Sequence, residues 1–166
     1  MRFTMKYPVL IISMLALPVY ADVQIDGNVE AKCIIQTDTS GVYGNPTATK
    51  LSTLPADGGV MPIVRYDVAV ADYYTAKITH PSAFSSSPTL TDTVAWTGES
   101  SVSQTTVAGM AGYDAAKVVY GSTTNFNLTL AGSTWFKTSS TATYGVGKSF
   151  PGGTYTAVVR AECIAN

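Results

Sequence analysis

The sequence predicts an all-β sandwich, and three observations lead to this fold class. Only 13% of the 166 residues are charged and 46% are hydrophobic, and beyond residue 21 Thr, Ser, Gly, Tyr and Val dominate, which favours strands over helices. Apolar and polar residues alternate at both ends of this region, as in half-buried strands. Turn signals recur between short extended stretches, a spacing typical of β-sandwiches.

Residues 1–21 are predicted to be a secretory signal peptide that is removed on export. Arg2 and Lys6 precede an apolar run over residues 9–17, and a small-x-small cleavage site follows Pro18. The alternative is an N-terminal membrane anchor, but the apolar run is shorter than the roughly 18 residues that span a bilayer. We therefore expect one exported domain, formed by residues 22–166.

The first strand is expected at residues 23–35. Its odd positions are apolar or small and most of its even positions are polar, so that one face would be buried.

Eight further strands are expected in the middle of the chain. Turn signals separate them, among them Gly44-Asn45-Pro46, the Asp57-Gly58-Gly59 run and Gly98. Residues 107–116 are expected to form a short helical turn or a loop. The expected strands are residues 48–54, 63–71, 74–79, 93–96, 101–106, 117–120, 125–130 and 133–138.

The chain is expected to end in a strand that follows the turn at residues 151–153. Tyr155, Ala157, Val159, Ala161 and Cys163 alternate there with more polar residues. These five side chains would share one face of the last strand.

Cys33 and Cys163 are the only two cysteines. An even count in a small exported domain favours a disulfide, and these two can form only one intramolecular bridge. Closing a loop of about 130 residues stabilises by on the order of 4 to 5 kcal/mol in the chain-entropy model. Two buried free thiols are the alternative. A bridge would require the first and last strands to approach each other.

Several function classes lack the residues that they need. Acidic residues outnumber basic ones, so no basic stripe is available for nucleic acid. One histidine and two cysteines cannot build a zinc site rich in these residues. Residues 145–149 resemble only the end of a phosphate-binding loop, because the required earlier glycine is replaced by Ala142. His80 precedes Pro81 and is expected to be an exposed turn residue rather than a catalytic base. We expect no enzymatic activity and no cofactor.

Tyr73, Tyr74, Trp96 and Trp135 offer a different possibility, a sugar-stacking platform on an exported β-domain. The alternative is that these aromatic residues fill the core, as strand aromatics more often do.

Both ends of the chain resemble pilin subunits of the bacterial chaperone/usher pathway. Residues 23–35 are similar to the alternating pilin opening, with Gly27 before the first strand and Cys33 after it, and residues 151–159 are similar to the Gly-x-Tyr closing strand. Residues 88–96 more loosely resemble the alternative, colonisation-factor-type branch of this family.

The resemblance implies an incomplete immunoglobulin-like sandwich with an apolar groove. In these pilins a periplasmic chaperone fills the groove first, and the N-terminal extension of the next subunit replaces it later. Within residues 22–32, the donated side chains would be Val23, Ile25 and Val29, with Gly27 where the backbones approach closely. The acceptor groove would be lined by Tyr155, Ala157, Val159 and Ala161.

The function implied is that of a structural subunit of a surface fimbria, which polymerises by donated strands and contributes to adhesion. Its partners would be other pilin subunits, the chaperone, an outer-membrane usher, and a host receptor or glycan. A first-to-last bridge would either close one end of the groove or belong to a subunit that is already complete. The alternative function is therefore a self-contained exported adhesin or carbohydrate-binding tip subunit.

Overall fold

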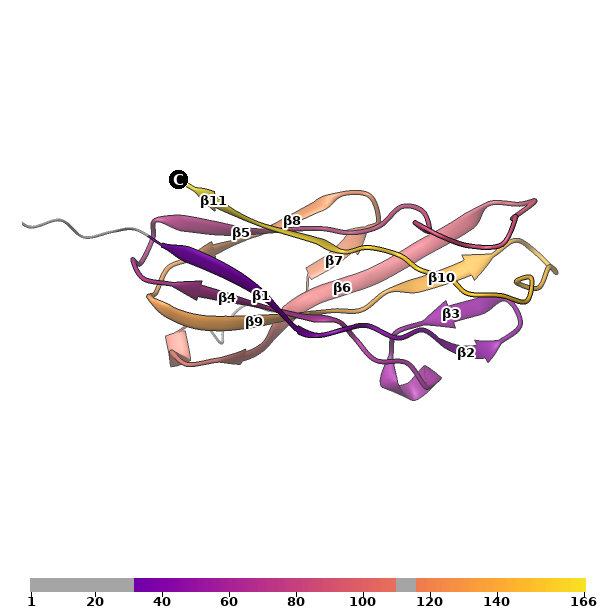
Figure 1. Cartoon of the computed structure of the whole chain (residues 1–166), viewed down its shortest axis with the longest axis horizontal. Helices are drawn as coiled ribbons and strands as arrows, with labels where there is room; N and C mark the ends of the chain where they lie inside the picture. Colours follow the sequence, from indigo (N-terminus) through magenta and orange to yellow (C-terminus); the bar gives the residue numbers. More distant parts are fainter. Residues whose placement is uncertain (1–31, 110–115) are drawn as a thin grey trace, which may run out of the picture.

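A computed structural model describes residues 32–109 and 116–166, which form two antiparallel sheets with almost no helix (Figure 1). The all-β prediction is thus confirmed. The predicted signal peptide and the donor residues Val23, Ile25, Gly27 and Val29 lie outside the described residues.

The larger sheet has the strand order β1-β4-β9-β6-β10-β3-β2, and β7 pairs with β6. A 3₁₀ turn, η1 (Pro55–Asp57), lies in the connection that leads to β4. The strands of this sheet are β1 (Cys33–Thr39), β2 (Gly44–Thr47), β3 (Lys50–Ser52), β4 (Ile63–Val68), β6 (Val94–Thr105), β7 (Ala116–Val119), β9 (Gly132–Thr138) and β10 (Thr141–Tyr144).

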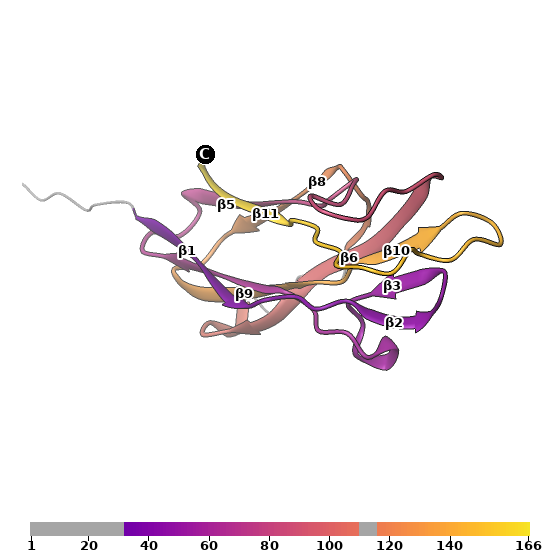
Figure 2. The same ribbon diagram turned by 45° about the vertical axis from the view of Figure 1, so that its right-hand side comes forward.

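The smaller sheet has the order β11-β5-β8 and consists of β5 (Tyr74–Thr79), β8 (Thr123–Leu128) and β11 (Arg160–Ala165). β1 and β11 are therefore edge strands of different sheets. They lie side by side, and the start of β1 and the C terminus are at the same end of the molecule (Figures 1 and 2).

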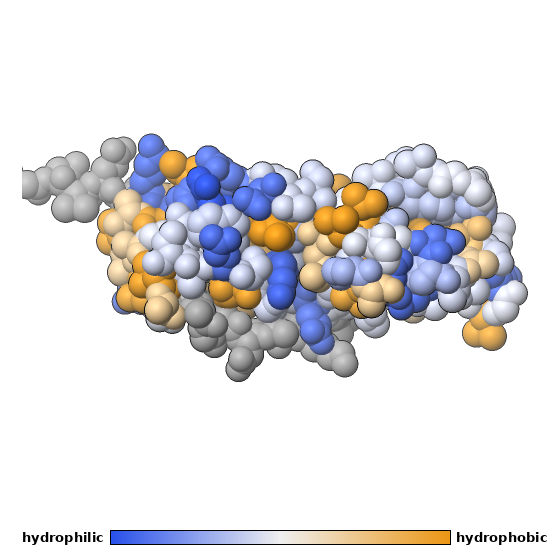
Figure 3. Space-filling model, turned by 90° about the horizontal axis from the view of Figure 1, so that it is seen from below, coloured by the Kyte–Doolittle hydropathy of each residue, from blue (hydrophilic) through white to orange (hydrophobic). Residues whose placement is uncertain are grey.

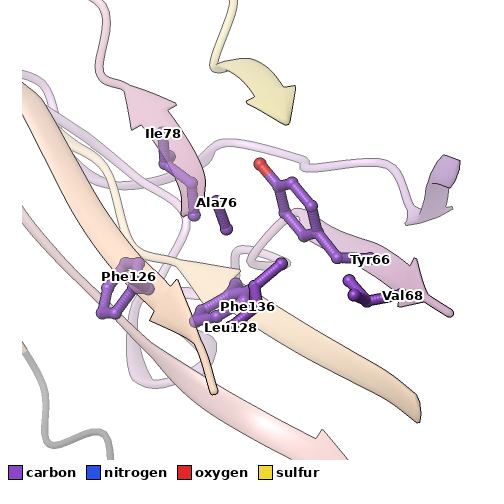
Figure 4. Packing of buried hydrophobic residues seen from close by; sticks show 7 residues of the cluster. All are labelled: Tyr66, Val68, Ala76, Ile78, Phe126, Leu128 and Phe136. Carbon is purple, nitrogen blue, oxygen red and sulfur yellow. The ribbon is translucent and has the colours of Figure 1, made fainter. Parts of the chain in front are cut away.

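Side chains from both sheets form the main core (Figure 4). The rings of Tyr66 and Phe136 from the larger sheet meet edge to face at 5.6 Å, and Phe126 from the smaller sheet packs on Phe136 at 4.5 Å. Because alternate residues of a strand face the same side, each strand contributes every second residue. The buried members are Tyr66, Val68, Ala76, Ile78, Phe126, Leu128 and Phe136.

A second, aromatic cluster includes Phe84 from the connection formed by residues 80–93. The Phe84 ring lies 4.7 Å from Trp96 and 5.0 Å from Tyr155, and Phe150 lies 5.2 Å from Tyr155. Since Phe150 and Tyr155 come from the stretch before β11, this cluster anchors that stretch to the body of the fold.

Several predicted boundaries are wrong. The first strand continues to Thr39 instead of ending at residue 35. Gly98 does not end a strand but lies inside β6, where the absence of a side chain admits the Tyr120 hydroxyl. Pro46 lies in β2, which tolerates it because β2 is an edge strand. The last strand begins at Arg160 instead of near Tyr155.

The surface facing the viewer in Figure 3 is mainly polar, with hydrophobic residues in separate patches. Among the described residues, no helix has the length and apolar character needed to cross a membrane.

Candidate functional site

A groove of about 870 Å³ lies between the end of β1 with the chain that follows it and the stretch that precedes β11. On one side its lining starts at Thr37 and continues to Asn45, and on the other it runs from Phe150 to Val159. Leu51, Thr53, Pro62, Val64, Pro81 and Ser140 complete the lining.

Both sides of the groove contain backbone with unused pairing capacity. β1 pairs with β4 on one side and is the last strand of its sheet on the other. Opposite it, Thr156 forms an isolated bridge with Ser86. Within the described part of the chain, the backbone of residues 157–159 makes no hydrogen bond to another backbone group. Edges of this kind are templates for an added strand.

A disulfide lies beyond one end of the groove. Cys33 and Cys163 are bonded, with their Cα atoms 6.5 Å apart, so the prediction of a bridge is confirmed. Cys33 pairs with Val68 in β4 and Cys163 pairs with Ala76 in β5. The bridge therefore joins the two sheets at their edges.

The groove lining is uncharged, since none of its residues is Asp, Glu, Lys, Arg or His. Its tyrosine hydroxyls are already hydrogen-bonded: Tyr43 Oη lies 2.8 Å from Ser140 Oγ, and Tyr155 Oη donates to the Pro151 carbonyl at 2.6 Å. Burial raises the pKa of both tyrosines, so both are neutral at pH 7. Such a lining offers apolar contact and backbone pairing.

The structure places three of the four predicted acceptor residues in the groove. Tyr155, Ala157 and Val159 line it as half-buried residues that alternate with exposed ones. Ala161 lies in β11 opposite Ile78 and packs against the main core instead.

The opposite wall was not predicted from the sequence. It includes Val42 and Tyr43, which lie between two expected strands, and Val64 in β4. The adjacent pair Val42-Tyr43 directly after Gly41 was the available signal, because two large apolar residues are unusual in a turn.

His80 is buried, with 2% of its surface exposed, so the expectation of an exposed turn residue is wrong. Its Nε2 lies 3.3 Å from the hydroxyls of both Ser100 and Thr124, and its ring packs against Tyr120 at 5.1 Å. Burial lowers the pKa of His80 to about 4. His80 does not line the groove.

The four aromatic residues of the supposed sugar platform are not brought together. Tyr73 and Tyr74 pack on each other at 4.9 Å, and Trp96 lies against Phe84. Trp135 lies on β9 with the Arg65 guanidinium 5.5 Å from its ring centre.

The loop with the partial phosphate-binding pattern is tied to a carboxylate. Lys148 Nζ lies 3.0 Å from Asp92 Oδ2, and this ammonium lowers the pKa of Asp92.

Among the residues that the structure describes, no cluster of three or more His, Cys, Asp or Glu residues is arranged to hold a metal.

Comparison with known proteins gives no family assignment: no family model, curated protein or solved structure matches this chain. The groove, its two edges and the disulfide are therefore the basis for a function.

Proposed function

We propose that this protein is a pilin-like structural subunit that polymerises into a surface fimbria by strand donation. The observation that carries the proposal is the uncharged groove between the β1 edge and the unpaired backbone of residues 157–159. In this proposal the fold is an immunoglobulin-like sandwich that lacks one strand, and the groove is the place of that strand.

A donated strand matches the groove in chemistry. Backbone groups of the strand would pair with β1 on one side and with residues 155–159 on the other, and alternate side chains would point inward. The donor stretch from Val23 to Val29 has apolar or absent side chains at its odd positions. Burying each large aliphatic side chain contributes roughly 1.5 to 3 kcal/mol.

The donor and the groove also match in length. From Val23 to Val29, and likewise from Val159 to Gly153, an extended chain covers about 20 Å at roughly 3.3 Å per residue. Residues 22–32 are therefore long enough to fill the groove.

The course of the chain at Lys32 favours donation to a neighbour. The Lys32 carbonyl accepts a hydrogen bond from the Ala69 amide at 3.0 Å, so pairing beside β4 extends to Lys32. To fill its own groove, residues 22–31 would have to turn back across the disulfide. Donation to the next subunit avoids this turn and produces a head-to-tail polymer.

Exposed edges also explain the proposed partners. An open apolar groove with free edges is an aggregation hazard. A periplasmic chaperone would therefore bind the groove first. At the outer-membrane usher, the donated strand of the next subunit would replace the chaperone. No catalytic step beyond disulfide formation is needed. Adhesion would follow from display of the polymer at the cell surface.

Thermal melting tests the proposal. A mature chain without residues 22–31 is melted with and without a synthetic peptide of residues 22–32. We expect the peptide to raise the Tm in a concentration-dependent way, equivalent to about 2.7 kcal/mol at 100 times its Kd. A matched peptide with Ile25→Asp should give a much smaller rise.

If the peptide causes no rise and the truncated chain is as stable as the mature one, the sandwich is complete. The alternative of a self-contained exported adhesin would then be favoured.

A further inference from the structure

The two edges that flank the groove converge at the disulfide. The Cα atoms of Cys33 and Cys163 are 6.5 Å apart, whereas a strand inserted between two others lies about 4.8 Å from each and needs its neighbours roughly 9.6 Å apart. A third strand cannot pass between the edges at this level.

Strand pairing in both sheets keeps the two edges close together at the disulfide. Pairing continues on both sides of each cysteine, from Lys32 to Thr39 along β4 and from Arg160 to Ala165 along β5. The groove lining begins four residues from each cysteine, at Thr37 on one side and at Val159 on the other. The lining therefore stops at Thr37 and Val159, on the side of the disulfide, and we call this the closed end. The end that includes Asn45 and Gly152 is called the open end.

We propose that the convergence of the two edges, held by the Cys33–Cys163 disulfide, is a mechanical stop that sets the register of the donated strand. This inference rests on the proposed function and adds to it the residues that position the donor. The alternation of a donated strand does not by itself determine its register, because a slip of two residues leaves the same face of the strand pointing inward. A fixed stop removes that ambiguity.

The stop also determines the direction of insertion. The C-terminal end of the donor is attached to the body of its own subunit at Cys33, so only the N-terminal end can reach the closed end of the groove. Val23 would then lie nearest the disulfide and Val29 at the open end. The donor would run antiparallel to residues 153–159.

In this register, donor and groove side chains are complementary in size. With Val23 beside Val159, the antiparallel arrangement places Ile25 beside Ala157 and Gly27 beside Tyr155. Ile25 thus meets a small residue, and the large Tyr155 meets a glycine. A slip of two residues toward the open end would instead place Ile25 beside the Tyr155 ring, and overpacking of this kind is costly.

Photo-crosslinking in the assembled full-length mature chain tests the register. A diazirine-bearing leucine analogue replaces Val23 or Val29, and mass spectrometry locates the crosslinks between subunits. We expect position 23 to crosslink near Val159, and position 29 to crosslink near Gly153 and Tyr43.

Removing the stop is the second arm of the experiment. In the double variant Cys33→Ala with Cys163→Ala, the crosslinks from position 23 should spread by two residues or more along the groove. Should this variant not fold, a chain with two residues added before Asp22 replaces it. With a stop in place, the addition shifts every crosslink by two residues toward the open end.

The outcomes separate the two proposals. Crosslinks that are scattered in the unaltered chain, or that stay in place in both variants, overturn the stop and leave strand donation intact. Absence of any crosslink between subunits overturns strand donation and the stop together.

Discussion

His80 is buried where the two sheets meet, among neutral neighbours. The hydroxyls of Ser100 and Thr124 contact Nε2, and Tyr120 covers the ring. Burial disfavours the charged imidazolium and lowers the pKa of His80 from 6.5 to about 4. This residue therefore couples stability to pH.

The sign of this coupling follows from proton uptake. The unfolded chain binds a proton at His80 below about pH 6.5 and the folded chain only near pH 4, so stability falls as the pH falls through this window. At about 1.4 kcal/mol per pKa unit, the unfolding free energy should drop by on the order of 3 kcal/mol between pH 7 and pH 4.

Denaturant unfolding at several pH values, compared with the variant His80→Gln, isolates the contribution of His80. The carboxylates with lowered pKa values, Asp57, Asp92 and Glu162, also destabilise the fold on acidification, but equally in both proteins. The same pH slope in both would contradict the prediction.

Gly98 is a second residue whose role depends on its surroundings. A Cβ atom at this position would overlap Tyr120 Oη and the Ser139 carbonyl oxygen. Gly98→Ala should therefore destabilise the fold by about 1 to 3 kcal/mol, as overpacking does. Gly152→Ala is the control, because nothing lies within 4 Å of its Cβ position. Equal Tm values for the two variants would rule out the close approach at Gly98.

At the scale of elements, strands with a clear period of two were predicted well. β5 has the expected bounds, β9 begins one residue earlier than expected, and β4 ends at Val68 instead of residue 71. The short strands β2 and β10 were missed, β2 because Gly44-Asn45-Pro46 was interpreted as a turn. The stretch from Tyr155 to Val159 alternates like a strand, but it does not pair with the β1 edge across the groove.

The alternation of the donor segment leads to a prediction on assembly. Val29→Asp places a charge on the face that would enter the groove, and burial of an unpaired carboxylate is strongly unfavourable. Asn28→Asp places the same charge on the opposite face. We expect Val29→Asp to reduce heat-labile, SDS-resistant multimers at least tenfold and Asn28→Asp to change them little. Equal multimer yields would refute the assignment of the donor face.

At the scale of the whole molecule, the groove wall can be tested without disturbing the core. Val42 and Val60 form a bridge pair and are 54% and 42% exposed, but only Val42 lines the groove. Val42→Asp should weaken binding of the residue 22–32 peptide at least tenfold, and Val60→Asp should leave it nearly unchanged. Calorimetric titration measures both, and a similar loss in the two variants would argue against binding in this groove.

The sequence by itself determined the all-β class, most of the strands and the only intramolecular bridge that its two cysteines could form. These features depend on local alternation, turn residues and cysteine count, which can be read along the chain. Only the tertiary structure decided that Tyr155, Ala157 and Val159 face Val42 and Tyr43 across an open groove, that Ala161 does not, and that His80 is buried. Contacts between segments about a hundred residues apart form only when the two sheets pack. A local sequence pattern does not specify which edges will then meet.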